Sequence, residues 1–430
     1  MFLFGKSKRQ DENALRSGTV ERVPSRMMAV PRSADVIADR DEVLGRLHDT
    51  DEISILSGTD LPIRVAYKGE EYTAEIGDMD FYADEHDPAL QKLSPGERKI
   101  TLAAKKALGL EMMFADNNMD SYHLQVKLLD MLVPDMAALI DDNSYRAHSG
   151  RWVAMTAASK VAPSPEYMFV IHCVSDDDSD SVWIHTHGLT RCGTIELEIL
   201  GADINNYSQL GDALNQMAQR LVGDNKFIDE KEPIYIGVCG EGREIHVTWQ
   251  RSEWSFKDFP KNILGGPQDR NEEHSINMGV IYLYADEKDI MDGKLTPIVK
   301  WQKELADNAI YFKTTAETQR MRALAQERVP ELKKLCRVPC EDERTVLLKI
   351  GLKPDEGLGF DDDQFEYIWF EADEMGEETF TATLTQDAYY VEGMVEGVQK
   401  EFTFDDIVDW RVYLEGECYT PDTVYRFCEE

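Results

Sequence analysis

Hydrophobic and polar residues alternate along two neighbouring stretches of the chain, and this alternation predicts a sheet. In the stretch 182–189, ring-bearing side chains share one face of a strand, namely Trp183, His185 and His187. The stretch 194–200 alternates between an apolar row and two acids, Glu196 and Glu198. Such alternation is typical of an antiparallel sheet with one buried face. Leucine and methionine recur at helical spacing between 208 and 221, so a helix is predicted to cover that face.

Further strands and one irregular segment complete the predicted central region. Strands are expected at 167–174, 234–239, 245–250 and 279–284, and Gly240-Glu-Gly-Arg243 is expected to be the turn of a hairpin. Residues 254–270 have little periodicity and contain Pro260, which predicts a long irregular connection. Strands, a helix and a second group of strands indicate the α+β class.

The N-terminal part has the same mixed character. Helices are predicted at 33–47, 95–107 and 121–132, and strands at 53–56, 62–67, 71–76, 136–140 and 152–155. Residues up to Arg26 are polar and aperiodic, so they are expected to form a loose tail. The predicted architecture is therefore antiparallel sheets with covering helices in both the N-terminal and the central parts.

The last ninety residues differ from the rest in pattern and in charge. Short strands separated by acidic turns are predicted at 367–370, 379–384, 400–404, 407–410 and 411–414, which indicates a small β-rich, barrel-like domain. A helix over 317–335, interrupted near Pro330, precedes it, and an entry loop is predicted at 353–363. At 430 residues, the chain is longer than one core usually organises. The predicted organisation is a tail over 1–26, an N-terminal α+β domain over 27–160, a central α+β domain over 161–340 and an acidic β-rich domain over 346–430.

The strongly negative charge of the chain limits the classes of partner that it is expected to bind. The formal net charge is −36, and residues 341–430 hold 26 acidic against 6 basic side chains. Such a surface repels phosphate backbones and anionic lipid, so we expect no nucleic-acid or membrane partner, whereas a basic protein partner is compatible with it. The seven cysteines are an odd number, and no apolar run approaches membrane-spanning length. We therefore expect a cytoplasmic protein with reduced thiols.

Two segments carry a resemblance to known families. The pattern Tyr367-Ile-Trp-Phe-Glu371, then Thr379-Phe-Thr-Ala-Thr-Leu384, then Phe404-Asp-Asp-Ile-Val-Asp-Trp410 resembles the bacterial domain of unknown function 2314. His185-Thr-His-Gly-Leu-Thr-Arg-Cys-Gly193, followed by Glu196-Leu-Glu-Ile199, makes the preceding region similar to domain of unknown function 4026. That preceding region is also similar to domains found among bacterial immunity proteins. The resemblance implies architecture and supplies no catalytic residue.

The candidate site consists of His185, His187, Glu196 and Glu198. Two imidazoles on one face of a strand, with two carboxylates on the next strand, form a reasonable ligand set for zinc or a similar divalent ion. His246 is a further candidate from a later strand. The alternative is that these polar residues simply form the solvated face of a half-covered sheet. Asp361-Asp-Asp363 lacks the ligand spacing of a calcium loop.

No nucleophile elbow or phosphate-binding loop is found in the sequence. We therefore expect a non-catalytic binding or regulatory protein that requires no cofactor, with a toxin-neutralising, immunity-like role implied by the resemblance. The alternative is a metal-dependent hydrolase that uses the histidine and glutamate face.

Overall fold

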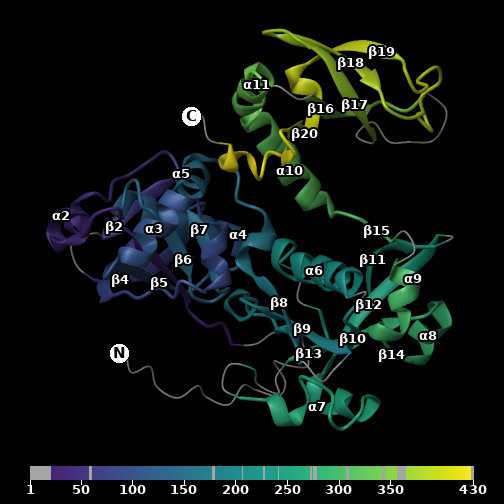
Figure 1. The fold of residues 1–430 in the computed structure, drawn as a ribbon, viewed down its shortest axis with the longest axis horizontal. Coiled ribbons are helices and arrows are strands. Elements are labelled where there is room, and N and C mark those ends of the chain that lie inside the picture. Colours follow the sequence, from purple (N-terminus) through teal and green to yellow (C-terminus); the bar gives the residue numbers. More distant parts are fainter. Residues whose placement is uncertain are drawn as a thin grey trace. The chain divides into compact units, whose positions relative to one another are not determined.

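The computed structural model describes residues 21–57, 61–176, 180–205, 207–225, 228–240, 242–271, 274, 278–306, 309–340, 344–355 and 365–427. Most of the predicted tail and entry loop, Glu241, and the triplet Asp361–Asp363 lie outside these ranges. The chain forms two compact units (Figure 1). The first contains the described residues up to Ala157 together with Pro163–Thr314, and the second contains Ala158–Ala162 and the residues from Thr315 onward.

An antiparallel sheet forms the N-terminal half of the first unit. Among the described residues its strand order is β2-β3-β4-β5-β1-β6-β7. Its strands are β1 (Ser25–Val30), β2 (Ile53–Ser57), β3 (Ile63–Tyr67), β4 (Glu70–Asp80), β5 (Lys106–Met112), β6 (Ala138–Asp141) and β7 (Arg146–Ser149). Its helices are α2 (Arg40–Gly45), α3 (Pro95–Ala103), α4 (Asn118–Leu132) and α5 (Gly150–Ala158). Nearly every side chain of α4 is buried, because this helix forms the core that packs on the sheet.

One predicted strand of this half is wrong. Residues 152–155 belong to the helix α5. The Ser149 hydroxyl accepts a hydrogen bond from the Trp152 backbone N–H at 3.0 Å, which satisfies a free donor of the first turn. Trp152, Val153 and Thr156 are buried at helical spacing. A four-residue apolar run does not distinguish a strand from a buried helix, and here the neighbouring serine favours the helix.

A second, mixed sheet forms the central half of the first unit. Its strand order is β15-β11-β12-β13-β10-β9-β8, and β14 pairs with β13. The strands are β8 (Val170–Ser175), β9 (Ser181–His187), β10 (Leu197–Asp203), β11 (Ile234–Cys239), β12 (Arg243–Arg251), β13 (Gly279–Tyr284), β14 (Thr296–Pro297) and β15 (Ile310–Tyr311). The helices are α6 (Ser208–Gly223), α7 (Ser252–Ser255), α8 (Glu287–Asp292) and α9 (Gln302–Ala306). β10 and β13 pair in parallel, so the central sheet is mixed, while its other neighbouring strands pair antiparallel as predicted.

The central sheet is covered on both faces at β9 and β10, which corrects the prediction of a single buried face. The amphipathic helix α6 covers one face, as predicted (Figure 1). The stretch predicted as an irregular connection covers the other, and we call residues 252–271 the covering segment. Its apolar side chains pack against a buried cluster that includes Trp183, Val280 and Tyr282. The face that carries the histidines is therefore interior.

A buried ion pair joins the two halves of the first unit. Arg191, which follows β9, donates to both carboxylate oxygens of Asp141 at the end of β6, at 2.8 and 2.7 Å. Both side chains are completely buried, and Arg191 also donates to the Ser25 hydroxyl and the Met168 carbonyl. A bidentate pair with further hydrogen bonds is the geometry that compensates for the desolvation of two charges.

The second unit is an antiparallel sheet with two helices. Its described strands have the order β19-β18-β17-β16-β20-β21. They are β16 (Thr345–Leu352), β17 (Glu366–Met375), β18 (Thr379–Leu384), β19 (Gln399–Thr403), β20 (Ile407–Leu414) and β21 (Glu417–Tyr419), and the helices are α10 (Thr315–Glu327) and α11 (Val329–Arg337). The break between the helices lies beside Pro330, as predicted. The Trp410 indole N–H donates to the Ala325 carbonyl, which ties α10 to β20.

The α+β class is confirmed, but the C-terminal sheet is open and not barrel-like over the described residues, because β19 and β21 are its two edges. The central strand β16, which contains Lys349, was not predicted, since the pattern of the sequence placed the first strand of this domain only at 367. The predicted domain limits near 160 and 340 stay predictions. Over the described part of the chain, no helix has the length and apolar character needed to cross a bilayer.

Candidate functional site: a histidine cluster on the central sheet

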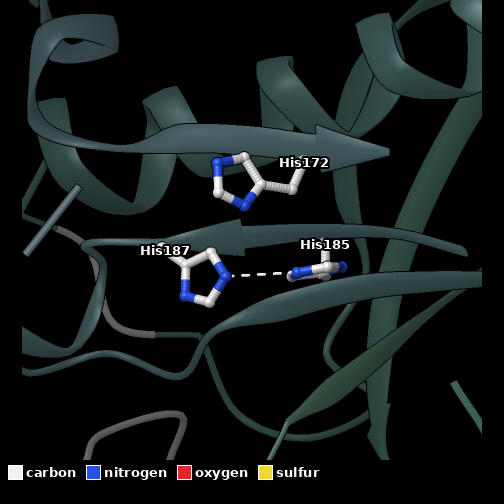
Figure 2. A group of neighbouring side chains, drawn as sticks. All are labelled: His172, His185 and His187. Atoms are coloured by element: carbon white, nitrogen blue, oxygen red, sulfur yellow. Dashed lines mark hydrogen bonds between the residues drawn. The ribbon is translucent and has the colours of Figure 1, made fainter. Parts of the chain in front are cut away.

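A cluster of imidazoles lies on the covered face of the central sheet. His185 and His187 are two residues apart on β9, so their side chains point to the same face. The antiparallel register of β8 and β9 places His172 directly opposite His185. Figure 2 shows His172 on the neighbouring strand beside the other two rings. Local strand geometry alone therefore brings the three histidines together.

The ring nitrogens of the cluster converge. One ligand atom from each of His172, His185 and His187 lies within 4.8 Å of the others. Among the described residues, these three side chains form a group that could hold a metal ion. His185 Nε2 lies 3.1 Å from His187 Nε2 (Figure 2) and 3.1 Å from His274 Nε2. The Nδ1 atom of His185 is buried and has no hydrogen-bond partner among the described residues. The groups that the structure describes therefore leave this nitrogen of His185 unsatisfied.

Burial keeps these imidazoles neutral. His185 is fully buried and His187 is 9% exposed. Burial, together with the neighbouring histidines, lowers the pKa of His185 to about 2 and that of His187 to about 3. Burial also lowers the pKa of His172. A neutral imidazole has a free nitrogen lone pair, which is the form that binds a metal ion.

Glu198 lies on the same face, as predicted, but its carboxylate points to other partners. It is paired with His185 across β9 and β10. Its oxygens accept hydrogen bonds from the Trp183 indole N–H at 2.8 Å and from Arg270 Nη2 at 2.9 Å. Burial raises the pKa of Glu198, and the Arg270 guanidinium opposes that rise. Glu198 therefore anchors the covering segment to the sheet.

Glu196 precedes β10 and organises the loop after β9. Its carboxylate accepts from the Thr186 hydroxyl at 2.7 Å and from the backbone N–H groups of Gly188 and Thr190 at 3.0 and 3.1 Å. His246 lies on β12, where it is 2.8 Å from a carboxylate oxygen of Glu244. These residues do not belong to the converging group.

His172 and His274 were not predicted from the sequence as members of the site. His172 had a detectable signal, because the strand 167–174 and the strand 182–189 flank a short acidic turn. Pairing them as a hairpin places His172 opposite His185. His274 had no such signal, since it follows an aperiodic stretch and is about ninety residues from β9 in the sequence.

The arrangement is a buried, nitrogen-rich site on a rigid strand pair. Imidazole suits zinc, copper, iron and nickel, and three protein ligands are enough to hold such an ion. Tyr145 lies against the rings of His172 and His187, with centroid distances of 5.8 and 4.9 Å. Tyr145 is 47% exposed and His172 is half-buried, so the cluster reaches toward the surface on this side.

Comparison with protein families agrees with part of the sequence resemblance. Residues 25–163 match the family described as Protein of unknown function (DUF4026) N-terminal. Residues 171–282 match Protein of unknown function (DUF4026) C-terminal, and this segment carries the histidines of β8 and β9. The two matches cover more than half of the chain, which therefore belongs to the DUF4026 family. No curated protein and no solved structure matches the chain.

Proposed function

We propose that this protein is a non-catalytic regulatory protein that binds a divalent transition-metal ion, of the zinc class, through His172, His185 and His187. The convergence of three imidazole nitrogens within 4.8 Å on one sheet face carries this proposal. Neutral rings held on two paired strands are preorganised ligands, so little ordering entropy is lost when the ion binds.

A regulatory role is better supported than hydrolysis. A metal-dependent hydrolase needs a carboxylate or other base that reaches the metal-bound water. The two carboxylates that the sequence offered for this role are engaged elsewhere, Glu198 with Arg270 and Trp183, and Glu196 with the loop after β9. The three histidines therefore offer ligands for an ion, but neither Glu196 nor Glu198 is placed to act as a general base.

Metal analysis of the purified protein tests the proposal. Protein prepared without a polyhistidine tag and without added metal is expected to contain stoichiometric metal, or to bind one equivalent of zinc after treatment with a chelator. The double variant His185→Ala/His187→Ala should lose that ion. The control is His246→Ala, a histidine on the same sheet outside the group, which should keep it. An unoccupied wild-type protein that binds no zinc would overturn the proposal.

The finer expectations from the sequence belong to the same proposal. They are a bacterial, cytoplasmic protein, a C-terminal domain like domain of unknown function 2314, and an immunity-like interaction with a basic protein. Exposed acids on the C-terminal unit favour such a partner, among them Glu374, Glu378, Glu392 and Glu401. Cross-linking to a basic partner that weakens with added salt supports this interaction, and salt-insensitive recovery counts against it.

A further inference from the structure

The covering segment reaches the histidine cluster at its C-terminal end. Arg270 pairs with Glu198 on β10, lies over the Trp183 ring at 5.1 Å, and donates to the Gly265 carbonyl. His274 follows four residues later, and its backbone N–H donates to the Asn271 side chain at 2.8 Å. Its ring is 4.8 Å from the ring of His185 and 5.1 Å from those of His187 and Trp183. A fourth imidazole therefore lies beside His185, next to the converging group of three, and it comes from outside the strand pair.

The distances between nitrogens do not suit hydrogen bonding alone. His185 Nε2 lies 3.1 Å from the Nε2 atoms of both His187 and His274. A neutral ring nitrogen is either one donor or one acceptor, so His185 Nε2 has no means of forming two ordinary hydrogen bonds. Ligands about 2.0–2.1 Å from a tetrahedral zinc ion lie about 3.3 Å from one another. Nitrogens that share one ion are expected at nearly this spacing.

We propose that His274, three residues beyond the covering segment, is the fourth ligand of the ion and that the ion thereby fastens the C-terminal end of that segment to the sheet. This inference rests on the proposed function of His172, His185 and His187. Four protein ligands close the coordination shell, as in structural and regulatory zinc sites, and leave no position for a substrate or an attacking water. The ion then bridges β8 and β9 to a segment about ninety residues further along the chain.

The bridge has a consequence for regulation. An ion that binds both the strands and His274 stabilises the arrangement in which the strands and the adjoining covering segment are together, and the attached segment strengthens ion binding by the same factor. The covering segment buries Trp183, Val280 and Tyr282. When more metal ion is available, the covering segment is therefore held more stably over this apolar face.

Zinc affinity and hydrogen exchange test the inference on the full chain. The wild type, His274→Ala and the control His246→Ala are stripped with a chelator and titrated with zinc against a chromophoric competitor. His274→Ala should weaken zinc binding by at least about 10- to 100-fold, the loss caused by removing only a hydrogen-bond partner of a ligand, and His246→Ala should leave it unchanged. Zinc should also slow amide exchange in residues 256–271 of the wild type, and not in His274→Ala.

The outcomes separate this inference from the proposed function. If zinc binds His274→Ala as tightly as the wild type and protects the covering segment equally, His274 is not a ligand and only the inference fails. If zinc does not bind the wild type, or still binds His185→Ala/His187→Ala, the proposed function fails first. Weakened binding by His274→Ala together with lost protection supports both.

Discussion

The central sheet and the C-terminal sheet are built from strands of similar pattern, yet they bury different parts of their surfaces. In β16 and β18, buried residues alternate with half-exposed ones, so one face is covered and the other meets solvent. In β9, the last six residues are all buried. β10 likewise buries Glu198 completely. The same alternation of residues therefore occurs in a sheet that is covered on one face in the second unit and in a sheet that is covered on both faces in the first.

The difference shows what a polar residue on a strand face means in each unit. On the open face of the C-terminal sheet, Lys349 and Arg411 lie over the Trp369 ring at 5.4 and 5.0 Å and keep their charges near water. On the covered face of the central sheet, polar groups have lost water and need protein partners or an ion. Glu198 has Arg270, and the histidines have one another. Polar residues are tolerated on the first face and are functional candidates on the second.

The largest expected contrast is between two glutamates, one on each sheet. Glu198→Ala leaves Arg270 and the Trp183 indole without their buried partner, so it should lower the free energy of unfolding of the first unit by about 3–5 kcal/mol. Glu371→Ala, on an exposed position of β17, should change stability by less than about 0.5 kcal/mol. Denaturant unfolding of the full chain, with hydrogen exchange to assign each transition, measures both. Equal effects would remove the distinction between the two faces.

Two glycines test how closely the covering segment approaches the sheet. Gly265 (φ +79°) and Gly397 (φ +86°) both have left-handed backbones, so alanine costs each about 1–2 kcal/mol of strain. A Cβ at Gly265 would also lie 2.6 Å from the Trp183 ring, whereas one at Gly397 meets no atom within 4 Å. Gly265→Ala should therefore destabilise its unit by about 3 kcal/mol in total, since overpacking adds about 1–3 kcal/mol. Faster exchange in residues 256–271 is the readout. If the two variants lose the same stability, the segment does not press on Trp183.

A third contrast concerns pH and the C-terminal sheet. Burial raises the pKa of Asp409 to about 6, so the folded unit holds its proton more tightly than the unfolded chain does. The resulting stability is present below pH ~4 and is lost as the pH rises through about 6, a change of at most about 3 kcal/mol since one pKa unit is ~1.4 kcal/mol. Asp409→Asn should remove this dependence and stabilise the unit at pH 8. Exchange rates of β16 and β20 amides between pH 4 and 8, corrected for intrinsic chemistry, check it. A wild-type stability that is flat over this range would contradict the shift.

Much of the candidate site was predictable because it is local. The i, i+2 spacing fixes His185 and His187 on one face, and a hairpin across the acidic turn places His172 opposite His185. The same logic put Glu198 on that face correctly. It did not reveal the direction of the carboxylate, because Arg270 lies about seventy residues away in sequence and approaches from the covering segment. It also missed His274 for this reason.

The sequence by itself determined most helices and strands, the α+β class and the sharing of one face by His185 and His187, because periodicity is a property of neighbouring residues. Only the tertiary structure decided that this face is buried. Residues 252–271 cover it through Phe256, Phe259, Ile263 and Leu264, although Pro260 and Gly265-Gly-Pro267 prevent a continuous helix there. Burial depends on what packs against a face, and the local pattern of a strand does not show which distant segment will cover it.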